Sequence, residues 1–321
     1  MSARPRVSVV MPVYNGQKYL RESIESVLRQ TFGDWELVVM DNRSTDETEA
    51  IGREYAAQDG RIRFIRCEEF VDVHANHNRA LRAIDSNSQY VKVLHADDWI
   101  YPECLARKVA IADEHPSASL VSSYRLQDTK VLHDGFFPYT QTFMEGKAAL
   151  RKSLLGPNWI TGSPTSLLFR ADLVRAEPRF FDDRVWHSDT DVSYRLMLQG
   201  DVAFVHQVLT FTRIHPGALT TFSYRVNSYI SQELRMLLRY GPIALEPKEY
   251  KTKLRFRLKA YLSFLAKQAL RPSRRRQDEY HRFHLRGIEQ MLTESRGERE
   301  VVVALTAARL LLREPSTPAS G

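Results

Sequence analysis

Two adjacent carboxylates, Asp97 and Asp98, follow an apolar run that starts at Tyr90 and predicts a buried strand. Charged side chains at the end of a core strand reduce stability unless a ligand or partner group neutralises them. A divalent cation bound together with the phosphates of a nucleotide would do so, because hard cations take oxygen ligands. The alternative is that Asp98 caps a helix opened by Pro102. Taken alone, the pair fits both interpretations.

The elements that precede this pair would bring other polar side chains to the same place. The residue pattern predicts strands over 6–12, 35–40 and 62–66, helices over 17–30 and 75–83, and a capped helix start at 44–49. Such alternation implies a parallel sheet with right-handed crossovers, and ligands bind beyond the carboxyl ends of its strands. The side chains expected there are Tyr14, Asn15, Asp41, Asp97 and Asp98. Helix capping alone does not explain that coincidence.

Three segments of the first fifty residues resemble the opening of the family 2 glycosyltransferases. They are Val7–Gly16, Ser26–Phe32 and Glu36–Thr48, and the resemblance extends from about residue 7 to about residue 221. It implies an α/β chain of the GT-A fold, a Rossmann-like, mostly parallel sheet flanked by helices, which binds a nucleoside-diphosphate sugar and inverts the anomeric centre.

The resemblance also assigns the donor-binding residues. Pro12, Val13 and Tyr14 match the loop that holds the donor base, with the Tyr14 ring as a stacking face; a core aromatic is the alternative. Asp41 matches a contact to the base or ribose. Asn42 stands where the family often has a second acid, and its amide can accept a hydrogen bond from a pyrimidine ring N–H. The presence of Asn42 in place of an acid therefore permits a UDP- or dTDP-sugar as the donor.

The metal motif of the family falls on the acid pair. The resemblance places Asp97 toward the ribose and Asp98 on Mg²⁺ or Mn²⁺, while His95 occupies the position of the first acid. A neutral imidazole cannot replace the charge of a carboxylate, so His95 would bond a phosphate or sugar, or face the core. His215 resembles a residue that relatives place near the metal or diphosphate, although a histidine before a proline is commonly structural.

His74 and His77 lie one helical turn apart and imitate a metal pair, but the sequence offers no third ligand nearby. We therefore expect them on a solvated helix face. Asn78, on the same predicted helix, matches a helical Asn of the family, with a structural or donor-side role.

Asp189 is the candidate general base. It opens a helix predicted to end at Gly200, and it resembles the Asp of the family's Glu-Asp motif, with Ser188 in place of the Glu. An inverting transfer needs a carboxylate near the acceptor hydroxyl to take its proton. A plain helix cap is the alternative role, and Asp191 is the nearest rival. The segment 159–170 resembles a loop that borders the two sugars.

Composition is consistent with a soluble enzyme of two parts. The 321 residues, 43% of them hydrophobic, can form a large core, and two cysteines give no disulfide framework, which favours a reducing cytosol. No apolar run approaches the length of about eighteen residues that would span a membrane. We expect a catalytic domain over 1–222, a helical basic extension over 223–314 and a disordered tail over 315–321.

The net charge of +7 is unevenly distributed. Twelve basic and two acidic residues between Lys251 and Arg286 give that segment +10, so the rest of the chain carries −3. Apolar residues recur at helical spacing there, which predicts an amphipathic basic helix that lies on an anionic membrane surface or packs on the protein. The cluster Arg274–Arg276 accompanies no nucleic-acid-binding fold, so we expect no nucleic acid partner.

The sequence thus predicts an inverting, metal-dependent transfer of a sugar to a hydroxyl of a glycan or lipid-linked acceptor. The expected setting is surface polysaccharide biosynthesis, in the cytoplasm or peripherally on the inner face of the membrane. Two alternatives stay open: a nucleotidyltransferase, and a catalytically inactive nucleotide-sugar-binding module. The sugar, the acceptor, the linkage and the oligomeric state are not predicted.

Overall fold

The computed structural model describes residues 4–133, 136–156, 163–269, 278–295 and 298–312 of the chain. By its internal contacts the chain divides into two compact units, 1–214 and 215–321. The helix α8 (Leu219–Val226), which contains the predicted domain limit at residue 222, belongs to the second unit. The domain limits predicted at 222 and 314 stay predictions.

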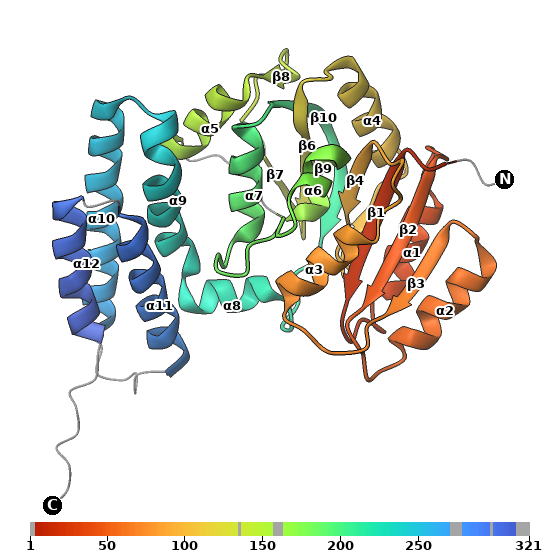
Figure 1. Cartoon of the computed structure of the whole chain (residues 1–321), viewed down its shortest axis with the longest axis horizontal. Helices are drawn as coiled ribbons and strands as arrows, with labels where there is room; N and C mark the ends of the chain where they lie inside the picture. Colours follow the sequence, from red (N-terminus) through yellow and green to blue (C-terminus); the bar gives the residue numbers. More distant parts are fainter. Residues whose placement is uncertain (1–3, 134–135, 157–162, 270–277, 296–297, 313–321) are drawn as a thin grey trace, which may run out of the picture. The chain divides into compact units, whose positions relative to one another are not determined.

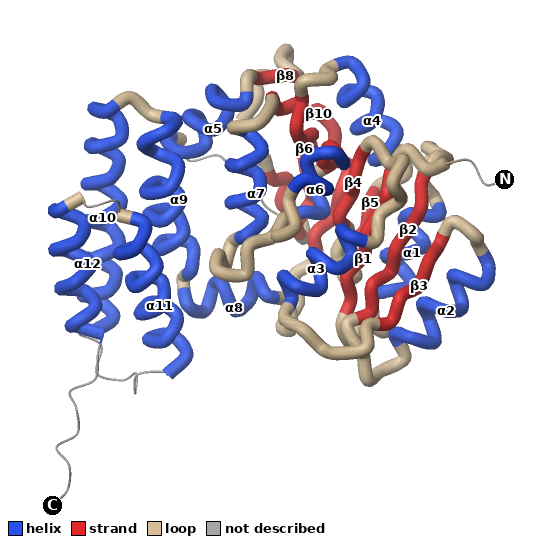
Figure 2. The backbone as a smooth tube through the Cα atoms, in the orientation of Figure 1, coloured by secondary structure: helices blue, strands red, loops and turns tan. Residues whose placement is uncertain are grey.

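A ten-stranded sheet forms the centre of the first unit within the described residues (Figure 2). Its main path runs β3-β2-β1-β4-β9-β6-β10-β5, with β7 paired to β6 and β8 paired to β10. The strands are β1 (Val7–Val13), β2 (Trp35–Asp41), β3 (Ile62–Arg66), β4 (Tyr90–Val93), β5 (Trp99–Ile100), β6 (Ala118–Gln127), β7 (Lys130–Leu132), β8 (Phe143–Met144), β9 (Leu168–Arg170) and β10 (Asp201–Thr212). The pairs β1·β2, β2·β3, β1·β4 and β6·β10 are parallel, and β9 runs antiparallel between β4 and β6.

Helices cover both faces of this sheet (Figure 1). They are α1 (Leu20–Leu28), α2 (Thr48–Gln58), α3 (Val73–Arg82), α4 (Cys104–Glu114), α5 (Gly146–Leu155), a 3₁₀ turn η1 (Pro164–Ser166), α6 (Ala171–Ala176) and α7 (Ser188–Met197). The helices α1, α2 and α4 share one hydrophobic core with the central strands, and α3, α6 and α7 lie on the opposite face. This is the predicted α/β architecture with helices on both sides.

The central strands are apolar runs because both of their faces are covered. All seven residues of β1 and of β2 are buried, which matches the continuous hydrophobic pattern of parallel strands better than an alternating one. The sequence predicted that Pro12 would stop the first strand, and this was wrong, since β1 continues to Val13. Beyond Val10 the strand β1 pairs only with β2, so Pro12 needs no N–H for a bond to β4.

The second unit is helical. After α8 it contains α9 (Ser228–Ala244), α10 (Pro247–Ala269), α11 (Asp278–Glu294) and α12 (Arg299–Leu312). The helix α9 packs on α10 and α11, and α12 packs on the same two helices. In the core the Tyr261 hydroxyl meets His284 Nδ1 at 3.1 Å, and His284 Nε2 meets the Val226 carbonyl at 2.7 Å.

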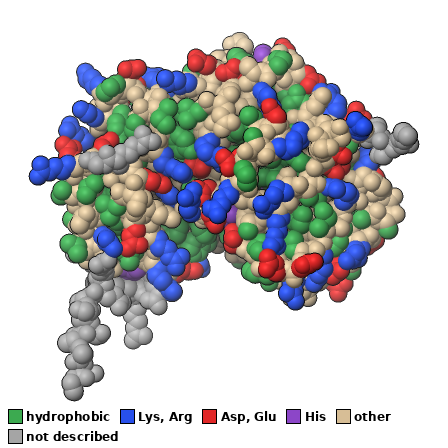
Figure 3. All heavy atoms as spheres, viewed as in Figure 1, with side chains coloured by type: hydrophobic (Ala, Val, Ile, Leu, Met, Phe, Trp, Pro, Cys, Tyr) green, Lys and Arg blue, Asp and Glu red, His purple; other side chains and the backbone are tan. Residues whose placement is uncertain are grey.

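The apolar stripe of α10 lies inside this bundle. Leu254, Leu258, Tyr261 and Leu265 are all buried, as the packing alternative requires. The basic side chains Lys251, Arg255 and Lys259 are exposed on the same helix. Figure 3 shows Lys and Arg side chains on the visible face of this unit. Among the described residues, no helix combines the length and apolar character that crossing a membrane requires.

Candidate active site

The carboxyl edge of the sheet gathers the predicted site residues of the first unit. The strands β1, β2 and β4 run parallel, so the segments after Val13, Asp41 and Val93 leave the sheet at the same edge. The strand β10 is parallel to β6 and delivers Arg213 to this edge as well. The helix α7 precedes β10 and begins on this side (Figure 1).

Three potential metal ligands converge after β4. One ligand atom each from His95, Asp97 and Asp98 lie within 4.8 Å of one another. Asp98 is 2% exposed, whereas His95 and Asp97 are half-buried. One nitrogen and two oxygen donors this close together can share a single divalent cation. The described residues therefore fit the cation that the motif predicts, and His95 belongs to the cluster rather than to the core.

Asp98 is bonded through both of its carboxylate oxygens. Its Oδ1 accepts from the Arg213 backbone N–H at 2.9 Å, and its Oδ2 accepts from Thr165 Oγ1 at 2.7 Å. Burial, followed by the charge of Asp97, raises the pKa of Asp98 above its usual value. The helix-cap interpretation of Asp98 was wrong, because α4 begins only at Cys104 and the carboxylate bonds other segments.

His77 supports His95 from α3. The two imidazole rings meet edge to face with their centroids 5.3 Å apart, and His77 also meets the Phe181 ring edge to face with the centroids 5.4 Å apart. Burial, with a smaller effect of His95, lowers the pKa of His77 to about 3, so the ring is neutral. The expectation of a solvated face was wrong for His77. Asn78 has a structural role, since its amide bonds both the N–H and the carbonyl of Phe181.

Two exposed aromatic rings stand beside the ends of β1 and β3. Tyr14 is 49% exposed and Phe70 is 58% exposed, and their ring centroids are 4.9 Å apart. The alternative that Tyr14 is a core aromatic was therefore wrong. Asn15, with φ of 50°, turns the chain after Tyr14, and its side-chain oxygen accepts from the Thr45 N–H at 2.9 Å. A residue that tolerates a left-handed conformation is needed at this turn.

Asp41 and Asn42 hold the loops that surround these rings. Asp41 is fully buried; its carboxylate accepts from the Ser44 N–H at 3.1 Å and pairs with Arg66 at 3.3 Å. The Asn42 amide donates to the Val71 carbonyl at 2.8 Å and accepts from the Val71 N–H at 3.1 Å. Direct contacts of Pro12, Val13, Asp41 or Asn42 with a base stay predictions.

Asp189 lies in the first turn of α7, as predicted. Its carboxylate accepts from the Thr190 N–H at 2.8 Å and is half-buried. The rival Asp191 is 1% exposed and pairs with Arg195 at 3.2 Å. Asp189 is thus the more accessible of the two carboxylates, and its role as general base stays a prediction. So does the ligand role of His215, which begins the second unit.

Three polar side chains around the acid cluster were not predicted from the sequence. Thr165 bonds Asp98, and Lys92 and Lys108 bond the turn that carries Thr165. A signal was present for Lys92, because it is the one charged residue within the apolar run 90–94. Of the predicted sugar loop at 159–170, residues 159–162 lie outside the described residues, and most of the remainder forms η1 and β9.

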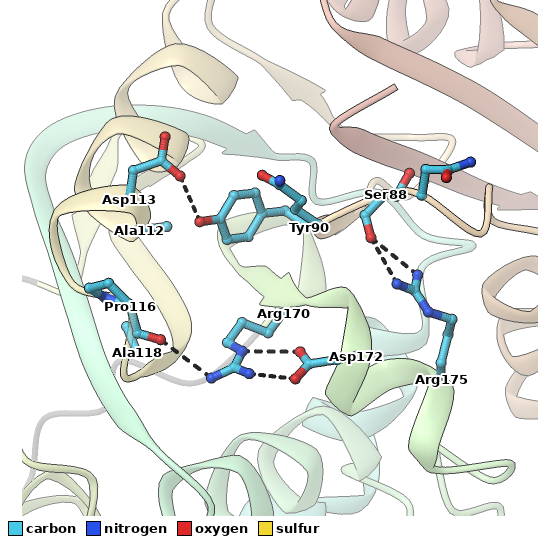
Figure 4. A pocket seen from close by; sticks show the side chains of 11 residues that line it. Ser88, Tyr90, Ala112, Asp113, Pro116, Ala118, Arg170, Asp172 and Arg175 are labelled. Atoms are coloured by element: carbon cyan, nitrogen blue, oxygen red, sulfur yellow. Dashed lines mark hydrogen bonds and ion pairs between the residues drawn. The ribbon is translucent and has the colours of Figure 1, made fainter. Parts of the chain in front are cut away.

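A hollow of about 470 Å³ lies at the opposite, amino edge of the sheet, at the starts of β4 and β6 (Figure 4). Among the described residues, the two arginines that line it are already bonded. Arg170 pairs with Asp172, and Arg175 donates to the Ser88 carbonyl at 2.9 Å. The Tyr90 hydroxyl donates to Asp113 at 2.8 Å. This hollow holds none of the predicted site residues.

Known proteins resemble the chain over the segment that contains this carboxyl edge. The family model described as "Glycosyl transferase family 2" matches residues 8–176, more than half of the chain. EpsE of Bacillus subtilis is 35% identical over 124 residues, which are 38% of this chain and 44% of EpsE. Glycosyltransferase GlyA of Streptococcus pneumoniae is 36% identical over 107 residues, which are 32% of this chain and 15% of GlyA. The chain thus spans less than half the length of these relatives.

Solved structures share the fold over nearly the whole chain. TarS of S. aureus (residues 1–349), crystallised with UDP-GlcNAc, superposes with a TM-score of 0.65 at 17% identity, covering 95% of this chain and 90% of that one. The mannosyltransferase PcManGT of Pyrobaculum calidifontis, in complex with GDP-Man and Mn²⁺, gives 0.59 at 18% identity, covering 98% and 89%. The fold shared with TarS and PcManGT and the acid cluster at the carboxyl edge both agree with the match to the family model. The chain belongs to glycosyl transferase family 2.

Proposed function

We propose that this protein is an inverting, metal-dependent glycosyltransferase that uses a nucleoside-diphosphate sugar. The observation that supports this most directly is the convergence of His95, Asp97 and Asp98 at the carboxyl edge of the sheet. Ligands of open α/β sheets bind at that edge. The family membership and the nucleotide-sugar complexes of TarS and PcManGT agree with it.

His95, Asp97 and Asp98 would hold the cation, and His215 is proposed as a further ligand. A bound cation neutralises the charge that develops on the leaving diphosphate. Carboxylate oxygens bind both Mg²⁺ and Mn²⁺, whereas an imidazole nitrogen binds transition metals such as Mn²⁺ in preference to Mg²⁺. We therefore propose Mn²⁺ over Mg²⁺. In the variant His95→Asp, which restores an all-oxygen set, we expect the ratio of Mg²⁺ to Mn²⁺ affinity to rise about tenfold, measured by calorimetric titration.

Tyr14 would bind the donor base. Its exposed ring offers a stacking face at the end of β1, and Phe70 lies beside it. Asp41 and Asn42 would fix the loops around the base, and Asp97 would also be near the ribose. The proposed donor is a UDP- or dTDP-sugar, and the complex of TarS with UDP-GlcNAc agrees with a pyrimidine base.

Asp189 would take the proton of the acceptor hydroxyl. The hydroxyl oxygen bonds the anomeric carbon while the bond from that carbon to the diphosphate oxygen breaks, so the sugar inverts and the nucleoside diphosphate leaves. Asp189 is half-buried at the start of a helix. A carboxylate at this place can accept the proton of a hydroxyl that lies within hydrogen-bond reach.

The proposed acceptor is a glycan or lipid-linked hydroxyl in surface polysaccharide biosynthesis. The basic face of α10 supports a peripheral contact with an anionic membrane. Because the apolar stripe of α10 is buried in the bundle, this contact would be electrostatic, without insertion of that stripe. Binding to anionic vesicles that 0.5 M salt does not weaken would argue against it.

The purified chain should release free nucleoside diphosphate from UDP- or dTDP-sugars with Mn²⁺ present, with water as acceptor. Asp189→Ala should abolish the release while calorimetry still detects UDP binding. Asp183→Ala, which removes an exposed acid six residues away, is the matched control and should keep the rate. Pyrophosphate in place of the diphosphate would indicate nucleotidyl transfer, and nucleotide binding without turnover of any donor would indicate an inactive module.

A further inference from the structure

Two lysines are completely buried in the first unit. Lys92 lies on β4 and Lys108 lies on α4, and each is 0% exposed. Lysine is almost never fully buried without partners, because removing an ammonium group from water is costly. Burial lowers the pKa of Lys92 to about 8, and it lowers the pKa of Lys108 as well. The burial of these two lysines therefore indicates a role that a hydrophobic side chain could not perform.

Both ammonium groups bind the same turn. Lys92 Nζ donates to the Thr165 carbonyl and, at 3.0 Å, to the Leu167 carbonyl. Lys108 Nζ donates to the Ser166 carbonyl at 2.6 Å. Three consecutive carbonyls of η1 and the residue after it are thus held by two side chains from separate elements. The turn is therefore held from the sheet by Lys92 and from the covering helix by Lys108.

That turn presents one hydroxyl to the acid cluster. Thr165 Oγ1 donates to Asp98 Oδ2 at 2.7 Å and accepts from the His95 backbone N–H at 3.3 Å. A single side chain therefore bonds both ends of the segment 95–98, which contains all three members of the cluster. The position of the Thr165 hydroxyl therefore sets the orientation of the Asp98 carboxylate relative to His95 and Asp97.

We propose that Lys92 and Lys108 are positioning residues for the metal site, acting through η1 and Thr165. The path runs from the ammonium groups to the carbonyls of the turn, from the Thr165 hydroxyl to Asp98, and so to the cation. It rests on the proposed function, since it requires that the cluster binds a divalent cation. Groups that bond a metal ligand commonly change metal affinity by about 10- to 100-fold when they are removed.

A double-mutant cycle on Mn²⁺ affinity tests the path. The variants are Lys108→Met, Thr165→Val and the pair together, each titrated with MnCl₂ by calorimetry and by the shift in melting temperature. Each single change should weaken Mn²⁺ binding by about tenfold. The pair should be hardly weaker than the stronger single variant, because both changes interrupt the same path. Thr165→Ser keeps the hydroxyl and should restore affinity to near that of the unchanged protein.

Ser119→Ala is the matched control. It removes another buried hydroxyl, which donates to the carbonyls of Leu196 at 2.8 Å and Asp201 at 3.1 Å and lies at the start of β6, at the opposite edge of the sheet from the cluster. It should lower the melting temperature and leave Mn²⁺ affinity unchanged. If Lys108→Met does not fold, Lys92→Met replaces it in the cycle, because it bonds the same turn.

Three results would overturn the inference. Lysine variants that lose stability but bind Mn²⁺ as the unchanged protein does would limit the lysines to packing. Additive effects of the lysine and threonine changes would mean that they act by separate routes. If the unchanged chain bound no Mn²⁺ even with UDP present, the proposed function would fail too, and that outcome is separate from the first two.

Discussion

Both edges of the central sheet carry charged groups, but the groups are arranged differently at the two edges. At the amino edge the charges are paired with one another: Arg6 contacts Asp113 at 2.8 Å, and Arg170 contacts Asp172. At the carboxyl edge two acids and a histidine lie together, and burial and like charge raise the pKa of Asp98. The first arrangement is already neutral, whereas the second gains from a cation.

This difference shows that a hollow does not by itself identify a site. The amino edge has a measurable cavity of about 470 Å³, but its arginines are bonded within the fold. The carboxyl edge is recognised by two adjacent carboxylates that lie close to His95 and by two exposed aromatic rings. Perturbed groups that converge at one place are the better physical marker of function.

The largest expected effect is the loss of the more exposed acid of the cluster. Asp97→Asn should lower metal-dependent sugar transfer by on the order of 10³-fold, because charge stabilisation by a bound metal is worth several kcal/mol in the transition state. The measurement is the rate of nucleoside diphosphate release at saturating Mn²⁺. If the variant kept more than a tenth of the rate, the cation would have to bind elsewhere. The carboxyl edge would then no longer differ from the amino edge in having a cation site.

The second effect concerns the aromatic pair. Tyr14→Ala and Phe70→Ala should each weaken UDP binding by about 5- to 100-fold, because stacking on an aromatic ring contributes about 1–3 kcal/mol per base. Pyrophosphate, which has no base, should bind both variants as it binds the unchanged protein. Phe256→Ala removes a ring of similar exposure from α10 and serves as the control. Equal losses for UDP and pyrophosphate would contradict a base platform.

Much of the carboxyl edge could be predicted from sequence because its signals are local. The strand 62–66 was predicted with its observed limits, and the alternation of strands and helices was enough to bring the segments after β1, β2 and β4 together. The acid pair stands at the end of one apolar run, so its position followed from one-dimensional pattern alone.

The missed residues depend on contacts between distant segments. Lys108 and Ser166 are 58 residues apart, and Asp98 and Arg213 are 115 residues apart. A hydrogen bond between such segments leaves no periodic pattern in the chain. His77 was misjudged for the same reason: its helix was predicted, but the face that meets Phe181 and His95 is set by tertiary packing.

The two edges should also respond to opposite ends of the pH scale. His77 has its pKa lowered from 6.5 to about 3, so the unfolded chain binds more protons and stability falls as pH decreases through that window. At the amino edge, burial and then the bond to Asp113 raise the pKa of Tyr90 from 10.0 to about 12. The folded state then binds more protons, and stability falls as pH rises through that window.

Urea unfolding midpoints across pH test this contrast. His77→Gln should flatten the acid side of the profile, and Tyr90→Phe should flatten the alkaline side, each leaving the opposite side unchanged. If Tyr90→Phe altered the acid side, the two edges would not be electrostatically independent.

The smallest expected effect is at the amino edge. Asp172→Asn removes the charge that pairs with Arg170, and the two side chains are 55% and 36% exposed. Exposed ion pairs contribute between about 0 and 1 kcal/mol, so the urea midpoint should move little. Sugar transfer should stay within about twofold, because this pair lies at the opposite edge of the sheet from the acid cluster. A loss of turnover beyond about fivefold at unchanged stability would show that the amino-edge hollow takes part in function. Ion pairing between the side chains of an edge would then no longer indicate that the edge has only a structural role.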